Sequence, residues 1–440
     1  MDSNAGGADP WLSNEKEGIV RRTFFILVAL ALVSATAASS SLDRVKEERH
    51  SSDPAGVLYW SQVAESTISV GRPPASSEVL NGLVHAAIYD TVVSVEGQYE
   101  PFAVSIRRTG PTSLDAAVAA AARGVLVVRV PGQASTVESA YAAFISEIPD
   151  GPAKINGIRL GRAVAGAYLA LRGDDGFDNV VPWVQPPPGP GVFEPIPPGS
   201  TPVDVKLKQV RPLAFDDPAR FRPDGPNSLT SHAYTVDFNE VKALGRIDST
   251  ERTPAQTEIA RFWTEQAMVF YNRNLRNLAD ENGLDALETA RMMAMVHVSA
   301  ADSLVGCWEA KYHYNFWRPQ HAIQRADTDG NPDTIQDTTW THLVLGNHPE
   351  YPSGHACFTS AVTRALTDYF GTDRVPWALT STVTGTTHSF DRLREIRAEV
   401  TGARIYGGLH FRKSLVDGDD LARRTTRYVL QHNFQEENGH

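Results

Sequence analysis

The sequence predicts an all-α protein in which one long loop, rich in proline and glycine, separates two groups of helices. Apolar residues recur at three- and four-residue spacing over most of the chain, which is the period of an amphipathic helix. The two-residue alternation typical of strands is scarce. Proline and glycine gather between Val181 and Pro226, where the missing proline N–H and the freedom of the glycine backbone prevent regular structure.

Helices are expected on both sides of this loop. On the N-terminal side, residues 55–180, the strongest helical patterns cover 77–95, 113–130 and 153–173, and Gly173 stands where a C-cap is expected. On the C-terminal side, residues 227–435, they cover 254–275, 285–317 and the stretch that follows Ser353. The loop at 181–226 either wraps a helical core or marks a boundary between halves, and we favour a single domain made from both sides.

The composition is that of a folded globular protein. Of 440 residues, 42% are hydrophobic and 21% are charged. The formal net charge of −11 argues against a general affinity for nucleic acid or for an anionic membrane surface, so any anion site must be a local group of arginines and lysines. The two cysteines, Cys307 and Cys357, support neither a disulfide framework nor a zinc site.

The first 40 residues resemble a signal peptide or presequence. Arg21 and Arg22 precede an apolar run from Phe24 to Val33, and the small residues that follow suit a cleavage site. A membrane-spanning helix needs about 20 apolar residues, roughly twice the length of this run. We therefore expect a secreted or lumenal protein without a stable membrane span after processing, with a single N-terminal anchor as the alternative.

Basic residues and histidines form three short groups in the C-terminal half. Lys311 and Arg318 are seven residues apart in a helical pattern, so we expect both on one helix face, with Pro319 ending or kinking that helix. Arg404 and His410 are separated by a glycine pair that lets the chain bend until both face one point. Any single pair of this kind is more often a solvent-exposed helix charge.

The third group lies in "PEYPSGHACF", residues 349–358. It places Ser353, Gly354 and His355 at the start of a helix, where unpaired N–H groups and the helix dipole favour an anion. An ordinary N-cap serine is the simpler interpretation, and only convergence with the other two groups distinguishes the two.

Together the groups resemble a known signature. K-x6-R-P, P-S-G-H and R-x5-H, in that order, are similar to the three-part motif shared by the vanadium-dependent haloperoxidases and the type 2 phosphatidic acid phosphatases. The resemblance extends over about residues 55–435 and is strongest to the soluble haloperoxidase-like branch. It implies a helical bundle that binds vanadate, with phosphate able to occupy the same site.

The resemblance also implies roles for individual residues. The oxyanion would be held by Lys311, Arg318, Ser353, Gly354 and Arg404, since forked guanidinium groups suit its oxygens. Lys311 would in addition be catalytic, by polarising bound peroxide.

Both histidines of the signature would be catalytic. His355 would be the acid–base residue, and His410 would either bond the vanadium or attack phosphorus. Trp308 and His348 match positions on the halide side of the haloperoxidases. The expected partners are therefore hydrogen peroxide, a halide and a small organic acceptor, with no nucleic acid.

Two other functions remain open from the sequence. An acid phosphatase would use His410 as nucleophile through a phosphohistidine, and a non-catalytic protein would only bind the oxyanion. The phosphatase pattern continues with an aspartate four residues after the histidine, where this chain has Ser414. We therefore expect no carboxylate partner for His410 unless Asp417 reaches back, which favours the peroxidase.

Three further polar residues lie near the first motif. His313 and His321 flank it and are candidates for contact with its cations. Asp302, nine residues before Lys311, either braces a cation of the site or is solvated.

Overall fold

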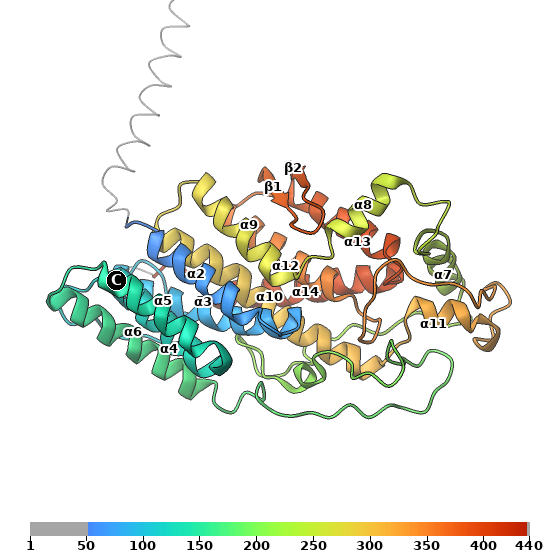
Figure 1. Ribbon diagram of the computed structural model, residues 1–440, viewed down its shortest axis with the longest axis horizontal. Helices are drawn as coiled ribbons and strands as arrows, with labels where there is room; N and C mark the ends of the chain where they lie inside the picture. The colour runs from blue at the N-terminus through green and yellow to red at the C-terminus, as the bar shows by residue number, and fades with distance from the viewer. Residues whose placement is uncertain (1–51, 438–440) are drawn as a thin grey trace, which may run out of the picture. The chain divides into compact units, whose positions relative to one another are not determined.

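The longest helix, α10 (Ala286–Tyr314), lies in the middle of the fold (Figure 1). The computed structural model describes residues 52–437, so the signal-like segment lies outside the described residues. Helix α10 is buried on nearly all sides up to Lys311, as expected for a helix that is apolar around most of its circumference. It packs against α3 (Pro74–Glu96), α12 (Gly354–Phe370) and α14 (Arg412–His432).

The first helices form a layer against one side of α10. They are α2 (Ala55–Ile68), α3, α4 (Leu114–Arg129), α5 (Ala134–Ser146) and α6 (Pro152–Leu171), with a 3-10 turn, η1, at Pro131–Gln133. Helices α4 and α6 approach closely because α6 presents glycines to the alanine-rich α4. A Cβ atom on Gly161 would lie 2.1 Å from the carbonyl oxygen of Ala117, so no larger residue fits there.

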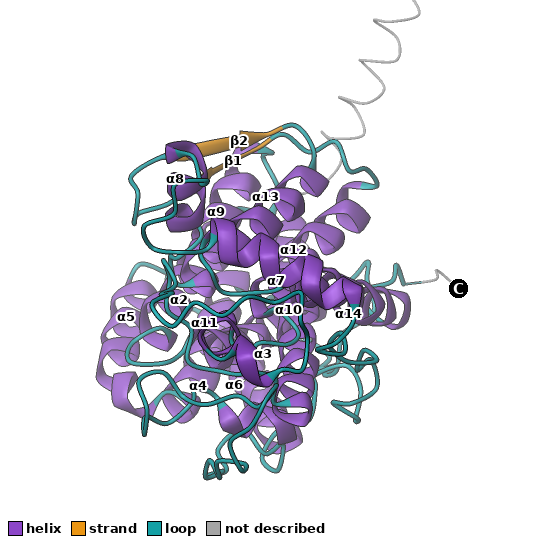
Figure 2. Ribbon diagram, turned by 90° about the vertical axis from the view of Figure 1, so that its right-hand side faces the viewer, coloured by secondary structure: helices purple, strands orange, loops and turns teal. Residues whose placement is uncertain are grey.

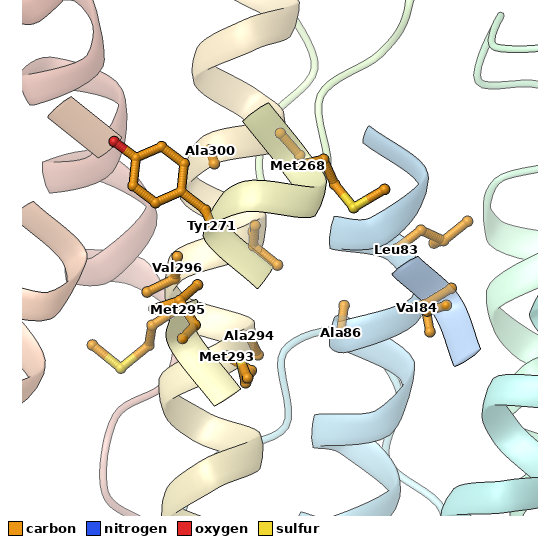
Figure 3. Packing of buried hydrophobic residues seen from close by; sticks show 14 of the residues in the cluster. Leu83, Val84, Ala86, Met268, Tyr271, Met293, Ala294, Met295, Val296 and Ala300 are labelled. Carbon is orange, nitrogen blue, oxygen red and sulfur yellow. The ribbon is translucent and has the colours of Figure 1, made fainter. Parts of the chain in front are cut away.

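Close packing of large and small side chains fills the interior where α3, α9 (Ala267–Glu281) and α10 meet (Figure 3). Met268 and Tyr271 of α9 belong to the same buried cluster as Met295 of α10 and Leu83 of α3. Unbranched methionines fill the irregular gaps that alanines leave between helices.

A long segment without α-helices joins the two groups of helices. Residues 172–231 contain only one 3-10 turn, η2 (Val205–Gln209). Asp302 of α10 anchors this segment, because its carboxylate accepts the N–H groups of Leu213 at 2.5 Å and Ala214 at 2.9 Å. The prediction for Asp302 was therefore wrong in both forms: it is fully buried, and it holds a loop rather than a cation of the site.

The second group of helices contains the predicted motifs. It comprises α7 (His232–Leu244), α8 (Pro254–Phe262), α9, α10, α11 (Pro319–Gln324), η3 (Ala326–Thr328), α12, α13 (Leu393–Tyr406) and α14. The helical pattern predicted at 254–275 is two helices, because Gln266 caps a new helix by accepting the N–H of Val269 at 2.8 Å.

The all-α prediction is confirmed, with one small exception. Strands β1 (Trp377–Thr380) and β2 (Thr387–Phe390) form an antiparallel hairpin in which Trp377 pairs with Phe390. Figure 2 shows these strands at one edge of the helices. Among the described helices, none has both the length and the apolar character that crossing a bilayer requires.

Candidate active site

Two of the three sequence groups meet at one cavity, and the cations of the first group, Lys311 and Arg318, lie behind its lining. The cavity has a volume of about 250 Å³, and its lining includes Gly354, His355, Arg404 and His410. These residues come from the start of α12, the end of α13 and the turn before α14. They are separated by up to 56 residues of chain, so only the packing of these helices brings them together.

The first group departs from its predicted geometry. Helix α10 ends at Tyr314, because Asn315 adopts a left-handed conformation with φ +48°. Arg318 is instead the extended N-cap of α11, which Pro319 begins, as expected from the steric effect of proline on the residue before it. Lys311 and Arg318 therefore do not share one helix face, and the turn between them directs both toward the same region.

The group of Ser353, Gly354 and His355 lies at the start of α12, and its last two residues line the cavity. Ser353 caps α12 by accepting the N–H of Ala356 at 3.4 Å. Gly354 lies against the indole of Trp308, where a Cβ would approach a ring carbon to 2.9 Å, so only glycine fits. The Trp263 carbonyl accepts a hydrogen bond from the His355 ring. The described residues provide no partner for the buried Nε2 of His355.

The position of Arg404 and His410 depends on a glycine turn. Gly408 has φ +73°, and a Cβ there would lie 2.5 Å from the carbonyl oxygen of Gly245. The chain reverses at this residue and brings His410 to the same cavity as Arg404. The Arg404 Nη1 donates to the Trp263 carbonyl at 3.1 Å, while its buried Nε has no partner among residues 52–437.

Lys311 lies behind the cavity rather than on its wall. Its Nζ donates to the carbonyl oxygens of Pro349 at 2.9 Å and Glu350 at 3.1 Å, and also to that of Pro352. The three ammonium protons are thus directed at the loop that leads into α12. In this arrangement Lys311 supplies charge to the site and fixes the loop, whereas direct contact with an oxyanion requires its side chain to rotate.

Arg318, like Lys311, is not among the residues that line the cavity. Its Nε donates to the carbonyl oxygen of His348 at 2.6 Å, and its Nη1 donates to that of Leu409 at 2.9 Å. The same Nη1 is 3.4 Å from Nε2 of His410. Arg318 therefore links the loop before α12 to the turn that holds His410.

Glu350 is the functional residue that the sequence prediction missed. Its Oε1 accepts the Nδ1–H of His410 at 2.9 Å and the backbone N–H of Phe411 at 3.0 Å. Its Oε2 accepts the hydroxyl of Ser414 at 2.5 Å, and the side chain is fully buried. The carboxylate partner of His410 therefore comes from the second motif rather than from the residues that follow His410.

The expectation that His410 lacks a carboxylate partner is therefore wrong, and Asp417 does not reach back to it. Asp417 accepts the Nζ–H of Lys413 at 2.8 Å and the hydroxyl of Tyr351. The sequence places Glu350 three residues before Ser353 in "HPEYPSGH", but spacing along the chain does not identify the partner of this carboxylate.

The histidines that flank the first motif lie away from the cavity. His313 is exposed beside Tyr314. His321 is buried, and the charged groups that act on its ring are those of Arg325 and Glu194. Neither lines the cavity.

Burial and positive charge keep both site histidines neutral. Burial lowers the pKa of His355 well below its usual value, and Arg404 lowers it further. Burial, followed by Arg318 and Lys311, has the same effect on the pKa of His410. Burial also raises the pKa of Glu350 to about 7. A neutral His410 that donates Nδ1–H to Glu350 presents the lone pair of Nε2 to the cations.

Trp308 and His348 also line the cavity, and their rings are neighbours. Their rings are 5.3 Å apart between centroids, tilted by 39°. The Nη2 of Arg318 lies 2.8 Å from Nδ1 of His348. Burial, with Arg318 next, lowers the pKa of His348 well below its usual value, so this ring is also neutral.

The donor set suits an oxyanion. Among residues 52–437, no group of three or more His, Cys, Asp or Glu side chains is arranged to hold a metal cation. The cavity instead has a guanidinium with an unpartnered Nε, an imidazole with an unpartnered Nε2 and the N-terminus of α12. Guanidinium groups and helix N-termini are the usual ligands of tetrahedral oxyanions.

Part of the chain matches a known family model. The family model described as the VCPO second helical-bundle domain matches residues 291–439, which contain all three motifs. The vanadium chloroperoxidase of Curvularia inaequalis is 27% identical over 186 residues, which cover 34% of this chain and 30% of that protein. The matched region is thus less than a third of the relative.

Solved structures share the fold over most of the chain. The crystal structure of the first bacterial vanadium-dependent iodoperoxidase has a TM-score of 0.73 at 20% identity, covering 88% of this chain and 97% of that chain. The holo-type bacterial vanadium-dependent chloroperoxidase has a TM-score of 0.68 at 16% identity, covering 88% and 99%. The fold is thus that of the vanadium-dependent haloperoxidases, and the segment with the three motifs, residues 291–439, is similar to the second helical bundle of the vanadium chloroperoxidases.

Proposed function

We propose that the protein is a vanadium-dependent haloperoxidase, which oxidises a halide with hydrogen peroxide at a vanadate bound by His410. The observation that carries the proposal is that His355, Arg404 and His410 line one cavity together with the neighbouring rings of Trp308 and His348. An oxyanion held by the first three residues would share the cavity with a ring pair of the kind expected beside a halide.

Some residues of the site would hold the oxyanion, and His355 would transfer protons. Arg404, whose buried Nε has no partner among residues 52–437, and the Gly354 N–H would hold oxygens, and Lys311 and Arg318 would add positive charge from behind. His355 Nε2 accepts or donates a proton at the cavity surface. The chemistry supplied by bound vanadate is Lewis-acid activation of hydrogen peroxide, without a change in oxidation state.

Lys311 fits a role in proton supply as well as in charge. Burial lowers its pKa to about 8. An ammonium group with such a pKa gives up a proton near neutral pH more readily than an exposed lysine does. We call Arg404, His410 and the N-terminus of α12 the cradle. Rotation of the Lys311 side chain away from its carbonyl partners would bring its ammonium group to peroxide bound there.

Glu350 favours a second candidate, an acid phosphatase. A nucleophilic histidine needs a carboxylate that orients its other nitrogen, and the 2.9 Å contact between Glu350 and His410 meets that need. His410 would then form a phosphohistidine, and His355 would protonate the leaving alcohol. The absence of a carboxylate at position 414 therefore no longer favours the peroxidase.

Two assays on purified protein separate these functions. We expect bromination of a dye in the presence of hydrogen peroxide, dependent on added orthovanadate, and little hydrolysis of a generic phosphate ester. His410→Ala should abolish bromination while some oxyanion binding remains, because the cations and the α12 N-terminus are intact. A trappable phosphohistidine, without vanadate-dependent halogenation of any halide, would establish the phosphatase instead.

The cellular location of the protein is inferred from its N-terminal sequence. We infer that the signal-like residues 1–40 direct the protein to a secreted or lumenal compartment, where it meets peroxide, halide and a small organic acceptor. Edman sequencing of the protein purified from its native source would identify the mature N-terminus, and retention of residues 1–40 would refute cleavage.

A further inference from the structure

The cavity continues past the oxyanion residues into an apolar chamber. Leu304 is one helical turn before Trp308 on α10, and Phe358 is one turn after Gly354 on α12. Residues four apart lie on one helix face, so the two helices extend both walls of the cavity by about 5 Å. Leu304 and Phe358 are each 2% exposed, and Ala267 at the start of α9 lines the same cavity.

The size of the chamber limits what it can hold. The whole cavity is about 250 Å³, below the ~300–1,000 Å³ typical of sites for drug-sized ligands. An engineered apolar cavity of about 150 Å³ is enough to bind benzene. Once an oxyanion occupies the cradle, the remaining space suits one ring or a short branched chain.

Charge limits the ligand further. Asp204 is on the chamber wall, in a left-handed conformation with φ +57°, and its Oδ2 accepts the N–H of Ser76 at 3.1 Å. A ligand in the chamber would thus share the cavity with this carboxyl group and a bound oxyanion, which both repel a second anion. The buried guanidinium of Arg404 in the same cavity repels a cation, so we expect an uncharged ligand.

We propose that this chamber binds a small, neutral, single-ring or branched organic molecule, and that this molecule is the acceptor that becomes halogenated. The inference rests on the proposed haloperoxidase function. Hypohalous acid formed at the cradle transfers its halogen to a ring carbon of the bound molecule. The O–X bond breaks, a C–X bond forms, and the displaced ring proton leaves with the hydroxide as water. Leu304, Phe358 and Ala267 would thereby determine which acceptor reacts.

Binding can be tested without turnover. The probes are 4-fluorophenol and 4-fluorobenzoate, which are similar in size but differ in charge, observed by fluorine NMR with protein saturated with orthophosphate. We expect the wild type to bind the phenol and to bind the benzoate at least tenfold more weakly. Ala267→Phe fills the chamber and should weaken phenol binding at least tenfold. The matched control is Ala142→Phe on the exposed surface of α5, which should have no effect.

A second variant distinguishes a change in the chamber from misfolding. Leu304→Ala enlarges the chamber and should allow 6-fluoro-2-naphthol, a two-ring phenol, to bind at least tenfold more tightly than it binds the wild type. A misfolded protein would not gain a ligand. Unchanged phenol binding in Ala267→Phe, or no gain of the naphthol in Leu304→Ala, would overturn the proposed chamber.

The acceptor role is tested by competition between two substrates. With vanadate, bromide and peroxide, we expect the ratio of phenol bromination to bromination of a bulky dye to fall at least tenfold in Ala267→Phe. An unchanged ratio, while vanadate-dependent bromination persists, means that oxidised halide reacts in solution and overturns this inference alone. No vanadate-dependent bromination by the wild type would instead overturn the proposed function, and the acceptor role with it.

Discussion

Glu350 shows how one buried side chain determines the state of the site. It contacts His410, Phe411 and Ser414, and its own carbonyl accepts from Lys311. The carboxylate fixes the tautomer of His410, because the Nδ1 proton is engaged and Nε2 is left with its lone pair. A residue of this kind acts through the histidine rather than on the oxyanion itself.

Glu350→Gln should weaken the site by removing the charge while keeping the size of the side chain. Loss of a carboxylate behind a ligating histidine typically costs about 10- to 100-fold in affinity or activity. We expect a loss of that size in vanadate affinity, measured by equilibrium binding. Glu309→Gln is the control, since Glu309 is also buried but pairs with Arg222. Equal losses in both variants would show a general effect on stability instead.

At the scale of elements, the turn between α13 and α14 depends on one glycine. Gly408→Ala places a Cβ in a left-handed conformation and against the Gly245 carbonyl. We expect it to lower the free energy of unfolding by at least about 1 kcal/mol and to reduce oxyanion binding, because His410 follows two residues later. Urea unfolding and phosphate titration measure the two effects.

The neighbouring glycine provides the control for that experiment. Gly407 has φ −75°, and a Cβ there would lie 3.1 Å from the Ala403 carbonyl oxygen. Gly407→Ala should therefore cost less than Gly408→Ala. The reverse order would contradict the assignment of the turn to Gly408.

The contact between α10 and the long loop predicts a pH dependence. Burial raises the pKa of Asp302 to about 7 from 3.8, so the folded protein retains a proton that the unfolded chain loses. Its stabilising contribution is complete below pH 3.8 and is lost as the pH rises through about 7. The difference of about three pKa units corresponds to roughly 4 kcal/mol as an order of magnitude.

Asp302→Asn isolates this contribution, because asparagine does not titrate. We expect the free energy of unfolding of the wild type, relative to the variant, to decrease from pH 5 to pH 8 in urea titrations. A relative stability that increases over this range would mean that the hydrogen bonds from Leu213 and Ala214 lower the pKa of Asp302 more than burial raises it.

At the scale of the whole molecule, the site concentrates positive charge within an acidic protein. Arg318 and Arg404 are buried with Lys311, although the formal net charge is −11. Burial lowers the pKa of Arg404 to about 9. A bound oxyanion would offset the cost of holding these charges together, so binding and folding should be coupled.

Orthovanadate and orthophosphate should therefore both raise the melting temperature. A ligand specific for the folded state at 100 times its Kd adds about 2.7 kcal/mol. Calorimetric scans at constant ionic strength, with chloride as the control anion, measure the effect. The rise should be smaller in His410→Ala. No rise with either oxyanion would contradict an oxyanion site.

The sequence by itself determined the helical class, the order of the three motifs and several of the residues that line the cavity. These follow from local information, namely helical periodicity, the Ser353 cap and the glycine pair before His410. Residue type at fixed spacing was also enough to indicate an oxyanion, because guanidinium groups and helix N-termini have few other ligands in common.

Only the tertiary structure decided which partners those residues contact. The end of α10 at Tyr314 separates Lys311 from Arg318, and long-range packing selects Glu350 rather than Asp417 as the partner of His410. The chamber next to the cradle likewise arises where α9, α10 and α12 meet. Contacts between distant segments depend on how helices pack, and the spacing of residues along one chain does not contain that information.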